Sequence, residues 1–311
     1  MSMTASDGAL QEIISGLQQT EKMISPKYFY DERGSQLFDQ ITTLPEYYPT
    51  ETEFGIMRES IDEIAGLIGP QASLIEYGSG SSRKTRVLLE HLNEQAVYVP
   101  VDISEEHLLE SARQLRSEFA SLEVLPVVAD FTKRFALPSP TVMPLRNIVY
   151  FPGSTIGNFT HAAAGDLLEV MYHEAGENGA MLIGVDLQKD PHIIERAYND
   201  SAGVTAEFNL NMLRHLNREY GSDFDLDSWS HEAHYNESEG RVEIRLINAT
   251  MQTIHIGQEQ VIIDEGEGIL TEYSHKYTLA GFAEMAEQSG FEVERVWTDA
   301  NDLFSVQYCT R

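Results

Sequence analysis

Two glycines after a short apolar run are the residues whose types and spacing most clearly permit chemistry. The segment Leu74–Tyr77 is apolar apart from Glu76 and predicts a buried strand, and Gly78-Ser79-Gly80 follows it directly. Glycine lets the backbone approach a ligand without interference from a Cβ atom, and the helical stretch that comes next offers free N–H groups. This order of strand, turn and helix start predicts a nucleotide-binding corner.

The same turn departs from the dinucleotide fingerprint G-x-G-x-x-G, because Arg83 stands where the third glycine belongs. The pattern Glu76-x-Gly78-x-Gly80 instead resembles the first motif of class I methyltransferases that use S-adenosylmethionine (SAM). Arg83 and Lys84 would fall in the first turn of the helix, where cations oppose the helix dipole. A bound carboxylate would offset that cost, and SAM carries one.

Three further predicted strand ends carry side chains suited to such a ligand. Asp102 can accept hydrogen bonds from both ribose hydroxyls, and Asp130 with Phe131 offers a carboxylate for an adenine amino group and a ring for its face. Asn158 offers a donor and an acceptor for a polar substrate such as an amino acid. In a doubly wound sheet, ligands bind at the carboxyl ends of the strands, so we expect these residues to converge.

The elements that must position these residues alternate between strand and helix from residue 61 to residue 186. This rhythm predicts an α/β fold with a Rossmann-like, doubly wound parallel sheet, as in class I methyltransferases. A helical stretch at Glu105–Phe119 has its apolar residues on one face. The predicted strands are Ser73–Tyr77, Val97–Val101, Glu123–Val128, Asn147–Phe151 and Ala180–Val185.

After residue 186 the alternation stops, which predicts a second, α+β region rich in antiparallel hairpins. A helix near Ala206–Tyr220 precedes strands expected at His231–Tyr235, Arg241–Thr250 and Gln260–Ile263. A helix at Thr278–Ser289 and strands at Phe291–Thr298 and Leu303–Cys309 then complete the first sheet. We place domain boundaries after residues 58, 190 and 277.

Composition narrows the classes of partner. The 311-residue chain has 21 Lys and Arg against 50 Asp and Glu, a formal charge of -29, which repels nucleic acid and anionic lipid. Its one cysteine, Cys309, excludes an internal disulfide and a thiolate zinc site, and the chain shows no export signal or spanning segment. We expect a cytoplasmic protein that binds a small molecule and no metal, with a monomer as the working expectation.

Five motifs, in their order along the chain, resemble the histidine-specific methyltransferases of ergothioneine biosynthesis. The similarity spans nearly the whole chain and is more specific than any one glycine loop. The motifs are Tyr28–Ser35 (YFYDERGS), Leu44–Thr50 (LPEYYPT), the Gly78–Gly80 turn, Gly153–Phe159 (GSTIGNF) and Thr271–Tyr277 (TEYSHKY).

The resemblance implies an enzyme that uses SAM to methylate the α-nitrogen of histidine three times, giving the betaine hercynine. It also implies a SAM-binding domain at residues 59–190, whose sheet residues 278–311 complete, and a substrate-binding α+β domain made of residues 1–58 and 191–277. Residues matched to SAM binding are Gly78, Ser79, Gly80, Lys84, Asp102, Asp130 and Phe131. Residues matched to substrate binding are Tyr47, Asn158 and Tyr198 around the α-amine and carboxylate, Glu272 and Ser274 on the imidazole, and Tyr30 and Phe38 near the reacting nitrogen. Tyr47, Tyr198 and Tyr30 are the candidate catalytic residues.

One residue departs from the family pattern. Ile244 stands where histidine-specific relatives commonly carry methionine against the imidazole, and isoleucine is stiffer and branched. An N-methyltransferase of tryptophan or another aromatic amino acid is therefore an alternative, although the carboxylate of Glu272 favours imidazole over an apolar ring. A non-catalytic SAM-binding or nucleotide-binding regulator is the alternative from another class. His231 and His234 lack the spacing of the zinc helix motif, so we expect no metal site there.

Overall fold

A computed structural model describes residues 5–79, 83–92 and 97–311, with the backbone alone for residues 5–7. The chain forms two compact units, described separately below. Unit 1 comprises Met1–Tyr48 and Lys189–His275, and unit 2 comprises Pro49–Gln188 and Lys276–Arg311. The chain therefore crosses between the units at 48/49, 188/189 and 275/276.

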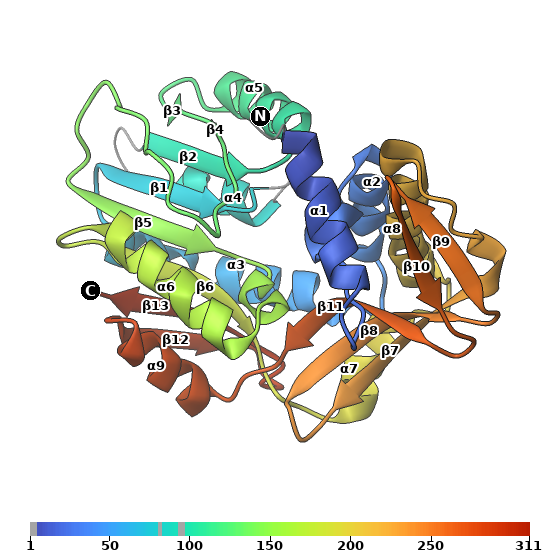
Figure 1. The fold of residues 1–311 in the computed structure, drawn as a ribbon. Helices are drawn as coiled ribbons and strands as arrows, with labels where there is room; N and C mark the ends of the chain where they lie inside the picture. The colour runs from blue at the N-terminus through green and yellow to red at the C-terminus, as the bar shows by residue number, and fades with distance from the viewer. Residues whose placement is uncertain (1–4, 80–82, 93–96) are drawn as a thin grey trace. The chain divides into compact units, whose positions relative to one another are not determined.

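Unit 2 is built on a mixed sheet with the strand order β12-β13-β6-β5-β1-β2-β3, in which β4 also pairs with β2 (Figure 1). The strands from β6 to β3 are parallel, whereas β13 runs antiparallel to β6 and β12 antiparallel to β13. The predicted α/β sheet, completed by the last two strands, is confirmed. The strands are β1 (Ala72–Tyr77), β2 (Val97–Asp102), β3 (Glu123–Val124), β4 (Val127–Val128), β5 (Arg146–Phe151), β6 (Ala180–Asp186), β12 (Glu292–Thr298) and β13 (Phe304–Thr310).

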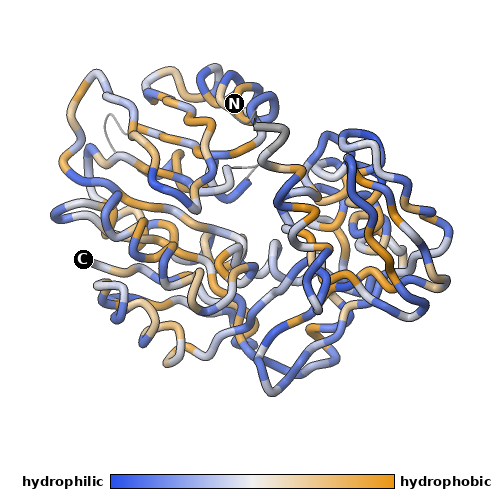
Figure 2. Tube along the Cα trace, viewed as in Figure 1, coloured by the Kyte–Doolittle hydropathy of each residue, from blue (hydrophilic) through white to orange (hydrophobic). Residues whose placement is uncertain are grey.

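Helices cover both faces of this sheet, because its central strands are apolar on both sides. Leu74 packs into a core with α3, α4 and α5, whereas the next residue, Ile75, packs into a second core with α6 and α9. Figure 2 shows the hydrophobic colouring along these strands. The helical segments are α3 (Tyr48–Ile68), α4 (Arg83–His91), α5 (Glu105–Glu118), η2 (Thr155–Asn158), α6 (His161–Ala175) and α9 (Leu279–Gln288).

The third predicted strand, Glu123–Val128, is two short strands in the structure. Pro126 lies between β3 and β4 and has no N–H to give to the ladder. Leu125 N–H still donates to the Tyr98 carbonyl at 2.8 Å, so the segment stays beside β2. The chain then continues past β4, so that Asp130 lies just beyond the end of that strand.

Unit 1 contains a three-stranded antiparallel sheet, β11-β8-β7, and a two-stranded sheet, β10-β9. Figure 1 shows these strands in orange beside α7 and α8. The strands are β7 (Trp229–Asn236), β8 (Arg241–Asn248), β9 (Gln252–Ile256), β10 (Glu259–Ile263) and β11 (Gly268–His275). The helical segments are α1 (Ala5–Leu17), η1 (Pro26–Phe29), α2 (Glu32–Ile41), α7 (Pro191–Tyr198), α8 (Val204–Tyr220) and η3 (Leu226–Ser228).

One face of the three-stranded sheet carries the core of unit 1. Along β8 every second side chain is buried, including Val242, Ile244 and Leu246. Val242 and Ile244 pack with residues of α7, while Leu246 packs with residues of α1, α2 and α8. Two neighbouring parts of the same sheet face are therefore covered by different helices.

The elements of unit 1 for which no range was predicted from the sequence include α7, β9 and β11. Helix α7 is only eight residues long, although its start carries a recognisable signal in Asp190, whose side chain accepts from His192 N–H, followed by Pro191. The first crossing between units falls at 48/49 and not after residue 58, since α3 continues without a break from Tyr48 to Ile68.

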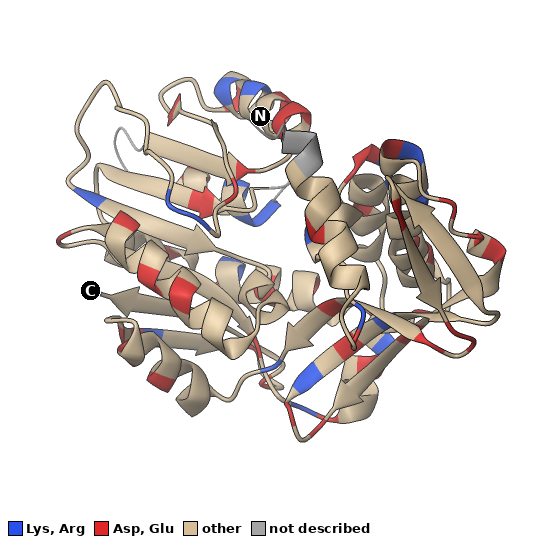
Figure 3. Cartoon of the chain, viewed as in Figure 1, with Lys and Arg blue, Asp and Glu red and all other residues tan. Residues whose placement is uncertain are grey.

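Acidic residues lie on helices and strands of both units (Figure 3), and over the whole sequence they outnumber the basic ones by 50 to 21. Among the described helices, none is both long enough and apolar enough to span a membrane.

Candidate functional site

The glycine turn lies directly after β1 in unit 2. Gly78 has φ +72°, a conformation that favours glycine, and its N–H donates to the Val101 carbonyl of β2 at 2.9 Å. A Cβ atom at this position would lie 3.8 Å from the Phe131 ring, and Ser79 is buried. The turn thus brings bare backbone next to an aromatic ring at the carboxyl edge of the sheet. Gly80 lies outside the described residues.

The two predicted strand-end aspartates lie at the same edge of the sheet. Asp102 ends β2 and accepts from Ser104 N–H at 2.9 Å, and burial raises the pKa of its carboxyl although this hydrogen bond acts in the opposite direction. Asp130 lies beyond β4, which pairs with β2 through Asp102. Burial acts to raise the pKa of Asp130, but hydrogen bonds from Thr132 and Lys133 outweigh it, so the pKa is lowered.

Phe131 extends this edge with an aromatic surface. Its ring centroid lies 5.3 Å from that of Tyr77 and 5.7 Å from that of Phe151, which end β1 and β5. The two strand-end rings thus hold Phe131 beside Gly78. Such a cluster offers a flat apolar surface next to a glycine turn, as an adenine ring requires.

Lys84 in the first turn of α4 forms an ion pair with Glu53, a residue that the sequence analysis missed. The Glu53 side chain is 1% exposed and also accepts from Gly153 N–H at 2.9 Å, so α3 is joined to α4 and to the end of β5. The carboxylate lies so close to β6 that a Cβ atom on Gly184 would be 2.1 Å from Glu53 Oε1. The signal that could have found Glu53 was the need of Lys84 for a counter-charge.

The carboxylates that offset the cations of α4 therefore come from the chain itself. Arg83 Nη1 lies 2.6 Å from Glu51 Oε1 on α3, an exposed pair, and Lys84 is paired with the buried Glu53. From the sequence we expect a bound carboxylate in this role, and the structure adds these two from α3. The assignment of Lys84 to SAM stays a prediction, with Glu53 as the group that orients it.

Glu76, the acid of the glycine motif, is fully buried inside unit 2. It accepts hydrogen bonds from Tyr98 Oη at 2.5 Å and from Thr85 Oγ1 at 2.8 Å. Burial raises the pKa of Glu76 to about 7, against the lowering effect of these two hydrogen bonds. Glu76 thereby links β1, β2 and the first turn of α4, which flank the glycine turn.

The segment after β5 continues the edge with a tight, small-residue turn. Gly153 has φ +80° and Ser154 φ +56°, and Ser154 Oγ accepts from Asp186 N–H at 2.9 Å, which fixes the turn to the end of β6. The short helix η2 follows and ends at Asn158. The structure thus places Asn158 just beyond a strand end in unit 2, as the sequence predicts.

Four of the predicted substrate residues come together on one face of the unit 1 sheet. Glu272 of β11 lies opposite Ile244 of β8, so their side chains share a face, and Ser274 lies two residues further along that face. Tyr198, the last residue of α7, brings its Oη to 2.8 Å from Ser274 Oγ. A carboxylate, two hydroxyls and an apolar wall therefore meet at the end of α7.

Aromatic rings form two further groups in unit 1. The Tyr47 ring lies 6.1 Å from the Tyr198 ring in an edge-to-face arrangement. Tyr30 and Phe38 have ring centroids 5.9 Å apart, and both lie within about 6 Å of Phe208 on α8. Phe208 was not predicted, because its spacing in α8 is that of an ordinary core residue.

The predicted residues divide between the two units. The described residues that are matched to SAM binding belong to unit 2, and so does Asn158. Unit 1 contains the other predicted residues, namely Tyr30, Phe38, Tyr47, Tyr198, Ile244, Glu272 and Ser274. Within unit 2 the SAM set gathers at one sheet edge, and within unit 1 the substrate set gathers on one sheet face and the aromatic groups beside it.

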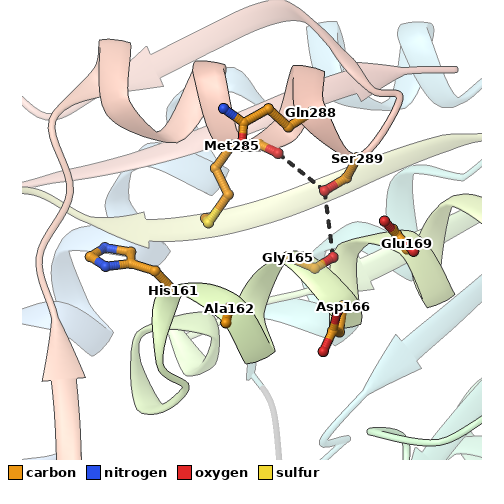
Figure 4. Close-up of a pocket in the computed structure, with 8 residues that line it drawn as sticks. All are labelled: His161, Ala162, Gly165, Asp166, Glu169, Met285, Gln288 and Ser289. Atoms are coloured by element: carbon orange, nitrogen blue, oxygen red, sulfur yellow. Dashed lines mark hydrogen bonds between the residues drawn. The ribbon is translucent and has the colours of Figure 1, made fainter.

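A groove between α6 and α9 of unit 2 is separate from these residues. It is lined by residues that include His161, Asp166 and Glu169 of α6 and Met285 of α9, as Figure 4 shows, and by none of the predicted site residues. Among the described residues, no group of three His, Cys, Asp or Glu side chains could hold a metal ion. His231 and His234 of β7 therefore belong to no such group of described residues.

The residues at this edge of unit 2 carry chemical groups that suit SAM. The glycine turn leaves room beside Phe131, where a Cβ atom would come within 3.8 Å of the ring. Asp102 and Asp130 supply acceptors for ribose hydroxyls and an amino group, and Lys84 supplies a cation near Gly153, whose Cβ position would be 3.9 Å from Lys84 Nζ. An open α/β sheet with this edge defines a class I methyltransferase.

Comparison with known proteins identifies the family. The model of the SAM-dependent, histidine-specific methyltransferases matches residues 9–311. This protein therefore belongs to that family, as the motifs suggested, and it is an enzyme whose cofactor is SAM.

Three relatives illustrate the similarity. The chain is 36% identical to the histidine N-alpha-methyltransferase of Mycolicibacterium smegmatis, over 99% of this chain and 96% of that protein. It is 38% identical to the protein of the same name from Mycobacterium tuberculosis, over 97% and 94%. It is 34% identical to ergothioneine biosynthesis protein 1 of Neurospora crassa, over 88% of this chain and 31% of that protein.

Proposed function

We propose that this enzyme transfers methyl groups from SAM to the α-nitrogen of L-histidine, and that three transfers give the betaine hercynine. The observation that carries the proposal is the arrangement of Glu272, Ser274 and Tyr198 on one face of unit 1, in a chain of the histidine-specific family. A carboxylate next to two hydroxyls suits a ligand that presents ring N–H groups.

The residues of unit 1 take distinct roles in this proposal. Glu272 accepts from an imidazole N–H and Ser274 bonds to the other ring nitrogen, while the buried Ile244 forms the apolar wall beside the ring. Tyr47 and Tyr198 bind the α-amine and carboxylate, and we assign Asn158 to amino-acid binding as well. Tyr30 and Phe38 line the pocket near the reacting nitrogen.

In unit 2, Asp102 binds the ribose, Asp130 the adenine amino group and Phe131 the adenine face. Gly78, Ser79 and Gly80 let the backbone approach the cofactor, and Lys84, oriented by Glu53, neutralises its carboxylate. When bound, SAM supplies an electrophilic methyl group on a sulfonium.

The chain itself contributes orientation, desolvation and charge stabilisation. Methylation needs an unprotonated α-amine aligned with the methyl group, so the tyrosines hold the amine in one direction and exclude water around it. The faces of Tyr30 and Tyr47 stabilise the ammonium that forms as methyl groups accumulate. Tyr47, Tyr198 or water removes each amine proton.

The alternatives are less well supported. Ile244 alone motivates a tryptophan methyltransferase, but the Glu272 carboxylate opposite it disfavours a larger apolar ring. A non-catalytic regulator would not need the complete set of substrate residues. We further propose that the enzyme acts in the cytoplasm as a monomer, and that its betaine product enters ergothioneine biosynthesis.

The test is a mass spectrum of the products formed by the purified protein from SAM and a mixture of the twenty amino acids. We expect trimethylated histidine, no product when SAM is omitted, and strongly reduced product with Asp102→Asn. Methylated tryptophan without methylated histidine would refute the histidine assignment. Calorimetry that detects NAD binding and no SAM binding would refute the methyltransferase itself.

A further inference from the structure

Asn209 in the middle of α8 is 1% exposed and bonds to all three strands of the β11-β8-β7 sheet. Its Nδ2 donates to the Arg245 carbonyl at 3.0 Å and contacts His231 Nδ1 at 2.9 Å, while its Oδ1 accepts from Thr271 Oγ1 at 2.8 Å. Because the Arg245 carbonyl can only accept, it determines which end of the amide carries the N–H groups. Asn209 therefore presents a donor to His231.

This contact determines the state of the His231 ring. Nδ1 accepts from Asn209, and Nε2 lies 2.8 Å from the Tyr198 carbonyl, which requires an N–H there. Both constraints select the neutral ring with its proton on Nε2. Burial lowers the pKa of His231, although the Tyr198 bond and the charges of Asp200 and Glu232 act to raise it, so the neutral ring is favoured.

The acceptor of this bond is the last residue of α7. The final carbonyls of a helix have no partner within the helix, and His231 supplies one for Tyr198. Asn199 Nδ2 next to it donates to the Ala233 carbonyl of β7 at 2.9 Å. The backbone of Tyr198 is thus held by β7, while its phenol lies on Ser274 of β11.

The carbonyl oxygen of the Asn209 side chain contacts a β-bulge in β11, next to Glu272. The register of β11 against β8 shifts between Leu270 and Glu272, and Thr271 is the residue inserted there. The Thr271 hydroxyl lies 2.8 Å from Asn209 Oδ1 and 3.1 Å from the Ile244 carbonyl. One buried amide therefore connects the strand of Glu272 with the histidine that holds Tyr198.

We propose that His231, oriented by Asn209, is a positioning residue for the amino-acid substrate. Its Nε2–H holds the end of α7 so that the Tyr198 phenol stays beside Ser274 and Glu272. This rests on the proposed function, since it assumes that these groups bind histidine. The network lies within unit 1, so it affects the affinity for histidine and leaves the affinity for SAM unchanged.

Three substitutions distinguish the hydrogen bond of His231 Nε2 from that of His231 Nδ1. In His231→Gln the side-chain amide can reproduce the Nε2–H bond to Tyr198, in His231→Asn it can reproduce only the contact with Asn209, and in His231→Phe both are lost. We expect His231→Asn and His231→Phe to weaken histidine binding by about 3- to 10-fold, the equivalent of one hydrogen bond. His231→Gln should bind histidine within about 2-fold of the wild type.

Calorimetric titration of the whole protein with histidine and, separately, with SAM provides the measurement. The matched control is His255→Phe on β9, whose exposed ring contacts Asp223, and it should leave both affinities unchanged. NMR of the ¹⁵N-histidine-labelled protein, assigned by the loss of a signal in His231→Gln, should show the neutral Nε2–H ring without any ligand. The spectrum itself is recorded on the wild-type protein, and only its assignment uses a variant.

Several results would overturn the positioning role. They are equal histidine affinity in the wild type and His231→Phe, equal weakening in His231→Gln and His231→Asn, a parallel loss of SAM affinity, or an NMR signal of the protonated or Nδ1–H ring. A wild-type protein that binds SAM but not histidine would instead refute the proposed function, a distinguishable outcome.

Discussion

The hydroxyl groups of Tyr198 and Ser274 lie 2.8 Å apart, although the two residues are 76 positions apart in the chain. Tyr198 ends α7 and Ser274 lies on β11, so this contact joins a helix end to the strand that also carries Glu272. The position of the Tyr198 phenol is therefore a property of the folded unit.

Replacing Tyr198 by phenylalanine tests what its hydroxyl does. We expect Tyr198→Phe to raise KM for histidine about 10- to 100-fold, the equivalent of a hydrogen bond to a charged group, with a smaller change in kcat. Initial rates at varied histidine and saturating SAM provide the measurement. Tyr273→Phe, on the same strand as Ser274, is the control and should change neither constant. A fall in kcat at unchanged KM would contradict a binding role and assign Tyr198 to proton removal.

The Glu53–Lys84 pair should be strongly coupled, because both side chains are largely buried. Glu53→Gln leaves the Lys84 ammonium without its partner and should lower the free energy of unfolding by about 3 kcal/mol in urea. The double variant with Lys84→Met should recover part of that loss. Arg83→Met, which breaks the exposed pair with Glu51, should cost less than about 1 kcal/mol. Losses that simply add in the double variant would show that the pair is uncoupled.

Gly184 and Gly55 should respond in opposite ways to alanine. A Cβ atom at Gly184 would lie 2.1 Å from Glu53 Oε1, so Gly184→Ala should lower the free energy of unfolding by about 1 to 3 kcal/mol. Gly55 lies in α3 with open space around its Cβ position, and Gly55→Ala should stabilise by up to about 1 kcal/mol. The same urea titration measures both, and a neutral Gly184→Ala would disprove the close approach of Glu53.

Glu76 should make stability depend on pH. Its pKa is raised from 4.5 to about 7 in the folded protein, so the folded state holds a proton that the unfolded state releases at a lower pH. Stability from this group is complete below about pH 4.5 and is lost as the pH rises to about 7. Glu76→Gln lacks this loss, and its stability relative to the wild type should increase by about 3 kcal/mol between the two ends of that window.

Unfolding in urea at intervals from pH 5 to pH 8 checks this prediction over most of the window. Gln keeps an acceptor for Tyr98 or Thr85 but not for both. The lost hydrogen bond shifts stability by a constant amount, so the pH dependence of the difference reports the charge. A constant difference between Glu76→Gln and the wild type across this range would mean that Glu76 titrates normally in the folded protein.

The interpretation of His231 shows how sequence reasoning fails for a buried polar network. The spacing of His231 and His234 indicated no zinc motif, and the described residues contain no metal cluster. What the spacing could not reveal is that the His231 ring lies between an α8 amide and the end of α7. Hydrogen bonds between residues far apart in the chain leave no periodic pattern in the sequence.

Local patterns along the chain were sufficient for the α/β sheet, the glycine turn at Gly78, and the strand-end positions of Asp102, Asp130 and Asn158. Such features depend on neighbouring residues, because strands, turns and their ends are set by side chains a few positions apart. The tertiary structure alone decided that Glu53 pairs with Lys84 and that Asn209 joins three strands. Packing between elements that are far apart in the chain brings those partners together. A polar group that is buried away from water needs such a partner within the protein.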